Sequence, residues 1–177
     1  MSQLELIPTD PYYLLDTNVI IDLARRSFPA AKYPALHKDL EKLISDGRVK
    51  SVREVYKELE EGKTTKPDLP LEWCRSHESI FLAPDDGDDE QMAIVVSHFE
   101  HEIAKSIRPY ADPYLVAHAL SHKCVIITDE SSTPNLNVPK IPEVCAKIGA
   151  DYDDIWKFFR KTGLIKYIEA REGALKR

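Results

Sequence analysis

Short β-prone apolar runs alternate along this chain with longer stretches in which apolar residues recur at helical spacing. The predicted strands are residues 12–15, 49–51, 80–82 and 124–129. The predicted helices are residues 19–26, 34–46, 51–61, 71–77, 88–107 and 112–121. Because two parallel strands need a crossover connection, which is usually a helix, this alternation predicts an α/β fold with a central parallel sheet.

The composition fits one compact domain rather than two. With 177 residues, 43% of them hydrophobic, the chain can bury a substantial core. Its cysteines, Cys74, Cys124 and Cys145, are odd in number and far apart, which favours reduced thiols over a disulfide framework or a structural zinc site. No stretch looks like a signal peptide or approaches the ~20 apolar residues that span a bilayer, so we expect a soluble, cytoplasmic protein.

The net charge of −6 does not exclude nucleic acid as a partner, because the charge is unevenly spread. Residues 155–177 contain seven Lys and Arg against two Glu, and bases near an acidic centre could hold phosphates. A solvated helical face with a frayed basic tail is the simpler interpretation of the last part of this stretch. The acidic run 85–90 lacks the calcium-loop pattern and is interpreted as the N-terminus of a helix.

Two of the predicted strands end in an aspartate. Asp16 follows the first strand and Asp129 closes the last one. Since parallel strands present their C-terminal ends at the same edge of a sheet, these two carboxylates can meet there. Asp112, at the start of a predicted helix, joins them if that helix packs beside this edge. Taken singly, Asp16 could be only a helix N-cap and Asp129 only a turn residue, so the prediction rests on their combination.

A fourth acid is available from the predicted helix 51–61. Glu54 and Glu58 are four residues apart and share one face, so either could reach inward. Carboxylates brought together repel one another unless a cation compensates them. Hard oxygen ligands suit Mg²⁺ or Mn²⁺, which activate water and neutralise the charge that grows on a phosphodiester. The sequence therefore predicts metal-dependent phosphodiester hydrolysis.

Two further groups of side chains have a structural interpretation. His118 and His122 are spaced like a zinc-binding pair, but no third ligand has a recognisable spacing, so we interpret them as helical-surface or interface residues. Trp156, Phe158 and Phe159 could stack on bases, but such aromatic residues more often pack a terminal helix against the core.

Two other functions compete with hydrolysis of nucleic acid at this point. One is a binding module with the same fold, in which the acids are only structural. The other is a phosphatase or phosphotransferase that uses the same edge of the sheet. The absence of an Asp-x-Asp pattern after the first strand counts against the second.

Four segments of this chain resemble the successive motifs of PIN domains, the fold of VapC-type toxin ribonucleases. They are Leu-Leu-Asp-Thr-Asn-Val-Ile at 14–20, Val-Tyr-Lys-Glu-Leu at 55–59, Ala-Asp-Pro-Tyr-Leu-Val-Ala at 111–117 and Ile-Ile-Thr-Asp at 126–129. Residues 140–145, with a glycine at 149, resemble a poorly characterised prokaryotic branch of that family. The resemblance extends from about residue 12 to 164, so we predict a single PIN-like domain over 1–164 and a basic C-terminal tail over 165–177.

This resemblance implies a three-layer α/β/α sandwich with a central parallel sheet. It implies Mg²⁺- or Mn²⁺-dependent endonucleolytic cleavage of RNA by the toxin component of a type II toxin–antitoxin pair. A cognate antitoxin protein is then the expected partner, and a homodimer formed through helices is compatible with the family. No membrane partner is expected.

The resemblance also assigns a role to individual residues. The catalytic and metal-binding residues would be Asp16, Glu58, Asp112 and Asp129, with Glu54 as the alternative glutamate. Asn18 and Thr128 would contact the substrate, with Thr17 and Asn18 shaping the strand end and the Thr128 hydroxyl reaching an acid or the scissile phosphate. Glu130 is an alternative to Asp129; we place Asp129 first because it directly ends the apolar strand.

Overall fold

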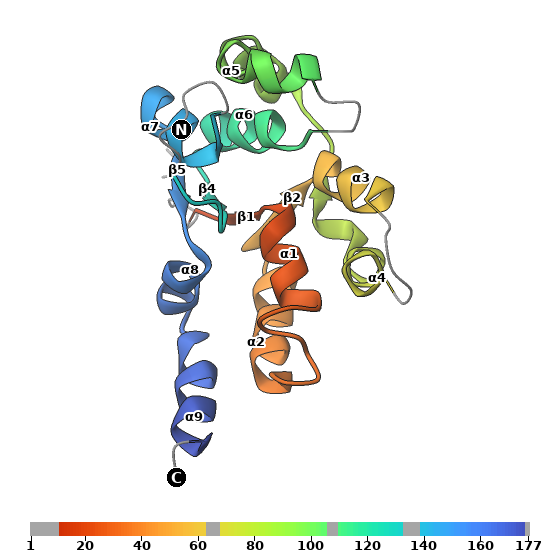
Figure 1. Cartoon of the computed structure of the whole chain (residues 1–177), viewed down its shortest axis with the longest axis vertical. Helices are drawn as coiled ribbons and strands as arrows, with labels where there is room; N and C mark the ends of the chain where they lie inside the picture. The colour runs from red at the N-terminus through yellow and green to blue at the C-terminus, as the bar shows by residue number, and fades with distance from the viewer. Residues whose placement is uncertain (1–10, 63–67, 106–109, 133–138, 176–177) are drawn as a thin grey trace, which may run out of the picture.

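A five-stranded parallel sheet, in the order β3-β2-β1-β4-β5, forms the centre of the molecule (Figure 1). The structure, a computed structural model, describes residues 11–62, 68–105, 110–132 and 139–175. The strands are β1 (Tyr13–Leu15), β2 (Val49–Val52), β3 (Phe81–Leu82), β4 (Val125–Ile127) and β5 (Asp151–Asp153). The predicted parallel α/β architecture is confirmed.

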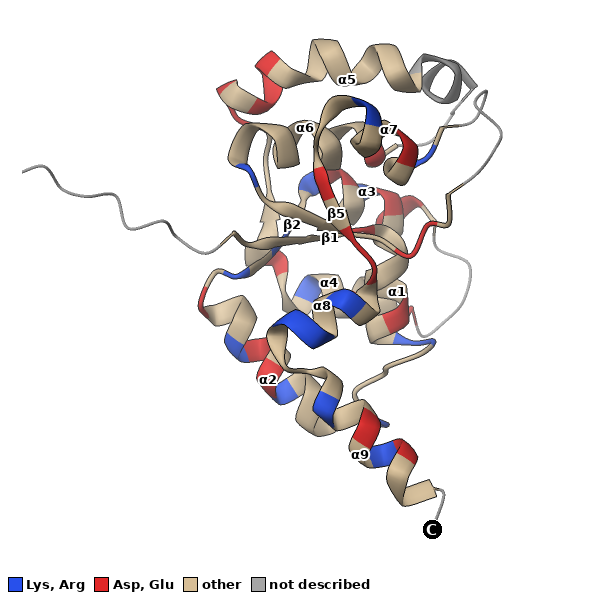
Figure 2. Cartoon of the chain, turned by 90° about the vertical axis from the view of Figure 1, so that its left-hand side faces the viewer, with Lys and Arg blue, Asp and Glu red and all other residues tan. Residues whose placement is uncertain are grey.

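Helices cover both faces of this sheet. They are α1 (Thr17–Ala24), α2 (Pro34–Ser45), α3 (Arg53–Glu61), α4 (Leu69–Ser76), α5 (Asp86–Lys105), α6 (Asp112–His122), α7 (Ile141–Ile148), α8 (Ile155–Thr162) and α9 (Ile165–Leu175). Helices α5, α6 and α7 lie over one face, and α1, α2, α8 and α9 lie on the other (Figures 1 and 2). The result is the predicted three-layer α/β/α sandwich. None of the helices in the described ranges is long and apolar enough to cross a membrane.

The junctions between strands and helices at one edge of the sheet are held by short side chains. Asp16 is the N-cap residue of α1, and its side chain accepts a hydrogen bond from the backbone N–H of Thr17, the first residue of the helix. The predicted helix 51–61 begins only at Arg53, and Ser51 is not its N-cap. The fully buried Ser51 hydroxyl instead donates to the Leu15 carbonyl at 2.7 Å, which ties the end of β2 to the end of β1.

The C-terminal part of the chain adds elements that the sequence patterns did not delimit. Strand β5 pairs with β4 at one side of the sheet, and α8 buries Phe158 and Phe159 in the core. Helix α9 occupies most of the residues predicted as a basic tail. Its Ile168 is buried, and the Arg171 guanidinium donates to the Lys32 carbonyl at 2.7 Å.

The strand order places a topological switch point at β1. From β1 the chain continues outward through β2 and β3, and it then returns to the other side of β1 with β4 and β5. In open parallel sheets, ligands bind beyond the carboxyl ends of the strands at such a point. The Asp16 backbone N–H donates to the Ile127 carbonyl at 3.0 Å, so the segments that leave β1 and β4 begin side by side.

Candidate metal centre

Four acidic side chains come together at the switch point. Asp16 leaves β1, Glu130 follows β4, Glu58 comes from α3, and Asp112 is the first residue of α6. Their charges act on one another, since Glu130 and Glu58 both raise the pKa of Asp16 and of Asp112. The sequence predicted Asp16, Glu58 and Asp112 for this edge, with Glu130 as the alternative to Asp129.

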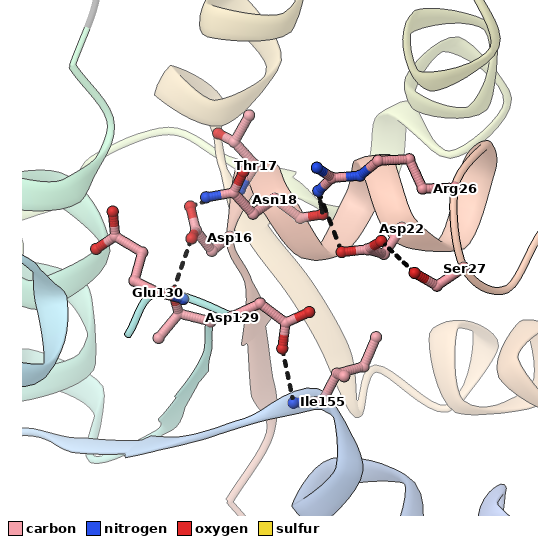
Figure 3. Close-up of polar contacts among 10 residues, drawn as sticks. Asp16, Thr17, Asn18, Asp22, Arg26, Ser27, Asp129, Glu130 and Ile155 are labelled. Atoms are coloured by element: carbon pink, nitrogen blue, oxygen red, sulfur yellow. Dashed lines mark hydrogen bonds and ion pairs between the residues drawn. The ribbon is translucent and has the colours of Figure 1, made fainter. Parts of the chain in front are cut away.

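Hydrogen bonds fix the orientation of the Asp16 carboxylate (Figure 3). One oxygen accepts from the Thr17 backbone N–H at 2.6 Å, and the other accepts from the Thr128 hydroxyl at 2.9 Å. The Thr128 hydroxyl in turn accepts from the Glu130 backbone N–H at 3.1 Å. The Thr17 hydroxyl donates to Glu58. Residues directly after β1 and β4 therefore hold the acids in place, and Thr128 makes the predicted bond to an acid.

Burial and mutual repulsion raise the pKa values of these acids. Burial, followed by the charge of Glu130, raises the pKa of Asp16 from 3.8 to about 7, against the opposing hydrogen bonds from Thr128 and Thr17. The pKa of Asp112 lies well above its usual range because of burial and the charge of Asp16. Burial also raises the pKa of Glu58, although hydrogen bonds from Thr17 and the Ala111 backbone oppose it. Full ionisation of this cluster is therefore unfavourable without a compensating positive charge.

The donor set of the cluster fits a hard divalent cation. Within the described ranges, no lysine or arginine forms an ion pair with any of the four carboxylates. The groups that meet there are carboxylate oxygens, which Mg²⁺ and Mn²⁺ prefer, whereas zinc sites usually include imidazole or thiolate. Asp16, Glu58, Asp112 and Glu130 could hold such an ion.

Asp129, the predicted fourth acid, lies on the other side of its segment (Figure 3). Its carboxylate accepts a hydrogen bond from the Ile155 backbone N–H at 3.4 Å, and burial and the charge of Asp22 raise its pKa. Successive side chains of an extended segment point to opposite sides. Thr128 and Glu130 therefore face the Asp16 cluster, and Asp129 faces α1 and α8.

The two candidate glutamates of α3 also separate in the structure. Glu58 accepts from Thr17, next to Asp16, and its charge acts on Asp16 and Asp112. Glu54 is buried one turn earlier and pairs with Lys57 at 3.1 Å. The geometry thus places Glu58, rather than Glu54, in the cluster.

A polar hollow of about 490 Å³ opens beside the acids. It is lined by Asn18, Asp22, Arg26, Ser27, Asp129, Glu130, Ser131 and Lys140. The Arg26 guanidinium contacts Asp22 at 3.2 Å and the Asn18 carbonyl at 3.3 Å (Figure 3). Asn18 thus lines this hollow together with Arg26 and Lys140, which come from segments far apart in the sequence.

A second open hollow of about 430 Å³ adjoins the first on the β5 side and is lined in part by Thr128, Glu130 and Lys157. Lys157 belongs to α8, which also carries Arg160 and Lys161 and which Figure 2 shows as blue bands below the red end of β5. Lys157 and Lys161 pair with Asp153 at 2.9 and 2.5 Å. Basic side chains thus approach the acidic edge from the α1, α7 and α8 segments.

The profile of a protein family described as a domain of unknown function (DUF4411) matches residues 13–165. The chain belongs to this family. All four acids of the cluster lie within the part of this DUF4411 protein that the family profile covers.

Comparison with solved structures confirms the PIN-like fold of this DUF4411 protein. A chain of VapBC2 from Rickettsia felis, crystallised with a DNA fragment from its promoter, is similar with a TM-score of 0.52 and 16% identity, over 81% of this chain and 98% of that one. A chain of FitAcB from Neisseria gonorrhoeae matches with a TM-score of 0.47 and 20% identity, over 81% and 98% of the two chains. A search of the curated proteins found no match.

Proposed function

We propose that this DUF4411 protein is a Mg²⁺- or Mn²⁺-dependent endoribonuclease. The observation that carries the proposal is the convergence of Asp16, Glu58, Asp112 and Glu130 at the switch point of a PIN-like sheet, with burial and repulsion raising the pKa of Asp16 and Asp112. A bound ion of this kind supplies an activated water and stabilises the charge that develops on a phosphodiester.

The protein's own residues hold and orient the reacting groups in this proposal. The four acids bind the ion, and Thr17 and Thr128 keep Glu58 and Asp16 in a fixed orientation. The hollow beside them receives the RNA backbone, where Asn18 offers an amide and Arg26 and Lys140 offer positive charge to phosphate oxygens. Asp129 also lines this hollow and is not proposed as a ligand of the ion.

The resemblance to VapC-type toxins and the similarity to the VapBC2 structure support a role in a toxin–antitoxin pair. In this proposal the partner is a cognate antitoxin protein, and the toxin forms a homodimer. RNA is the proposed substrate.

Cleavage should depend on the metal ion. We expect the full-length protein to cut a fluorescently labelled single-stranded RNA internally in Mn²⁺ or Mg²⁺, and to lose this activity in EDTA, because the ion would lower the pKa of the attacking water and stabilise the charge that develops on the phosphodiester. Product lengths on a denaturing gel measure the reaction, with a DNA strand of the same sequence as a comparison. Equal cleavage in EDTA would contradict the metal site. RNA binding without any cleavage in either ion would favour the binding-module alternative.

Glu130 should matter more than Asp129. Replacing Glu130 with Gln removes a carboxylate that faces Asp16, so we expect at least ~10-fold slower cleavage, since losing about 1.4 kcal/mol of transition-state stabilisation has that effect. Asp129→Asn, one residue away, removes the same charge from the other side of the segment and should change the rate by less than ~3-fold. Single-turnover rates in Mn²⁺ measure both variants. The opposite order would restore Asp129 as the fourth acid.

A further inference from the structure

A second cluster of metal-ligating side chains lies at the other end of α6. Asp88 in the first turn of α5 contacts His118 and His122 in α6, with His118 Nδ1 to Asp88 Oδ2 at 2.8 Å and His122 Nε2 to Asp88 Oδ1 at 3.5 Å. Asp112 begins α6 six residues before His118, which places the two clusters roughly 9 Å apart along the helix axis. Of the two roles that the sequence suggested for these histidines, surface or interface, the surface role is wrong for His118, which is 3% exposed and contacts Asp88 of α5.

The three side chains converge as ligands of one ion would. One ligand atom from each of Asp88, His118 and His122 lies within 4.8 Å of the other two. The two imidazole rings stack with centroids 4.2 Å apart and an interplanar angle of 28°. Residues four apart on a helix lie on the same face, so α6 presents both imidazoles to Asp88 without any change of backbone.

A buried oxygen at the centre of this cluster lacks a hydrogen-bond donor. Asp88 is 4% exposed, and its Oδ1 has no hydrogen-bond partner among the described residues. The helix cap explains the other contacts, since Asp85 and Asp88 each accept from the backbone N–H of the other, at 3.0 Å for Asp85 and 3.3 Å for Asp88. The cap leaves Asp88 Oδ1 without a hydrogen bond, at 3.5 Å from His122 Nε2, and a buried carboxylate oxygen that lacks a hydrogen bond is costly.

The surroundings of His118 also match those of a metal ligand. Its Nε2 is 2.7 Å from the Tyr12 hydroxyl, and its Nδ1 faces Asp88. Metal-ligating histidines typically use one ring nitrogen for the ion and donate a hydrogen bond from the other to a nearby oxygen. Asp85 adds a second carboxylate beside the cluster, because its Oδ2 lies 2.8 Å from His122 Nε2.

We propose that Asp88, His118 and His122, with Asp85 as the fourth ligand, form a Zn²⁺ site that joins the start of α5 to the end of α6. Two imidazoles with carboxylates suit zinc, whereas the all-carboxylate cluster near Asp16 suits a hard cation. The two helices approach closely here, as the space around Gly87 shows: a Cβ atom added to Gly87 would lie 2.2 Å from Ser121 Oγ. The ion holds α6, which carries Asp112 at its other end, against α5.

Zinc titration of the full-length, metal-stripped protein tests this site. Calorimetry should show Zn²⁺ binding whose affinity falls at least ~10-fold in His122→Ala, because that variant loses a ligand of the ion. Even the loss of a group that only orients a metal ligand lowers the metal affinity by about 10-fold or more. His98→Ala, a histidine of α5 outside the cluster, is the matched control and should bind as the unmodified protein does. Asp16→Asn should also retain this binding, which separates the zinc site from the proposed nuclease site. Co²⁺ should give visible absorption bands that disappear in His122→Ala.

Stability provides a second readout. Zn²⁺ should raise the melting temperature of the unmodified protein and of His98→Ala, because an ion that binds only the folded chain stabilises it, but not that of His122→Ala. Asp88→Asn, compared with Asp89→Asn at the exposed neighbouring acid, provides the same contrast on α5. Zinc affinity that is unchanged by both His122→Ala and Asp88→Asn, or that is lost in Asp16→Asn, would overturn the proposal. So would the absence of zinc binding to the unmodified protein.

Discussion

Replacing Asp112 with Asn should lower the rate of RNA cleavage by ~100-fold or more. Loss of a metal-ligating carboxylate removes several kcal/mol of charge stabilisation in the transition state, and each 1.36 kcal/mol is a factor of ten in rate. The fold should persist, because Asp112 is repelled by Asp16 and Glu130 and contributes no more than about 1 kcal/mol as an acid in the first turn of α6. Single-turnover cleavage at saturating Mn²⁺ measures the loss.

Asp46→Asn is the matched control for this experiment. Asp46 is an exposed acid after α2, next to the start of β2 and so at the opposite edge of the sheet, and its replacement makes the same change in net charge. Its cleavage rate should stay within ~2-fold of the unmodified protein, since isolated surface substitutions have small effects. Asp112→Asn that remains folded by circular dichroism and still cleaves at the control rate would remove Asp112 from the metal centre.

The sequence predicted those parts of the fold in which apolar residues form a continuous run or recur at helical spacing. The runs that became β1 and β4 are almost entirely apolar because helices cover both faces of a parallel sheet. Strand β5 was missed because it reads Asp-Tyr-Asp, with two of its three residues exposed at the side of the sheet. Its strand conformation comes from pairing with β4, which no local pattern encodes.

The meeting of acids at one edge of the sheet could be predicted for the same kind of reason. Parallel strands must bring the residues after β1 and β4 to one edge, so Asp16 and an acid near the end of β4 were predictable. Side chains alternate between the two sides of an extended segment, so only one of Asp129 and Glu130 faces the Asp16 cluster. Which one does so depends on how far the extended conformation continues past Ile127, and the apolar pattern of the sequence does not determine that. His118 posed a different problem, because its partner Asp88 lies thirty residues away on α5 and only the packing of two helices brings them together.

Helix α6 connects the two proposed metal sites and also separates them. Asp112 at its N-terminus faces the carboxyl ends of the strands, while His118 contacts Tyr12, which precedes β1 at the opposite edge. In the two proposals, α6 contributes a carboxylate at one end and two imidazoles at the other. A variant that cannot bind the ion at one end of α6 should still bind the ion at the other end.

Asp16→Asn should reduce the loss of stability that the metal-free protein suffers as the pH rises. In the unmodified chain the Asp16 pKa is 3.8 when unfolded and about 7 when folded. Below pH ~4 the carboxyl is neutral in both states, and between these two values only the unfolded chain releases the proton. Stability contributed by this group is therefore lost as the pH rises to about 7, by roughly 4 kcal/mol at most, at about 1.4 kcal/mol for each pKa unit.

The asparagine variant separates this effect from ordinary structural damage. Its side-chain amide has no proton to release, so denaturant unfolding in EDTA should show a smaller loss of stability between pH 5 and pH 8 than in the unmodified protein. Any hydrogen bond that the amide fails to make with Thr17 or Thr128 lowers stability equally at both pH values, and it leaves the difference unchanged. At pH 8, Mg²⁺ or Mn²⁺ should restore stability to the unmodified protein but much less to Asp16→Asn, because the ion neutralises the charge that Asp16 supplies. The same pH dependence in both proteins would mean that Asp16 ionises freely, and the four acids would then not form one cluster.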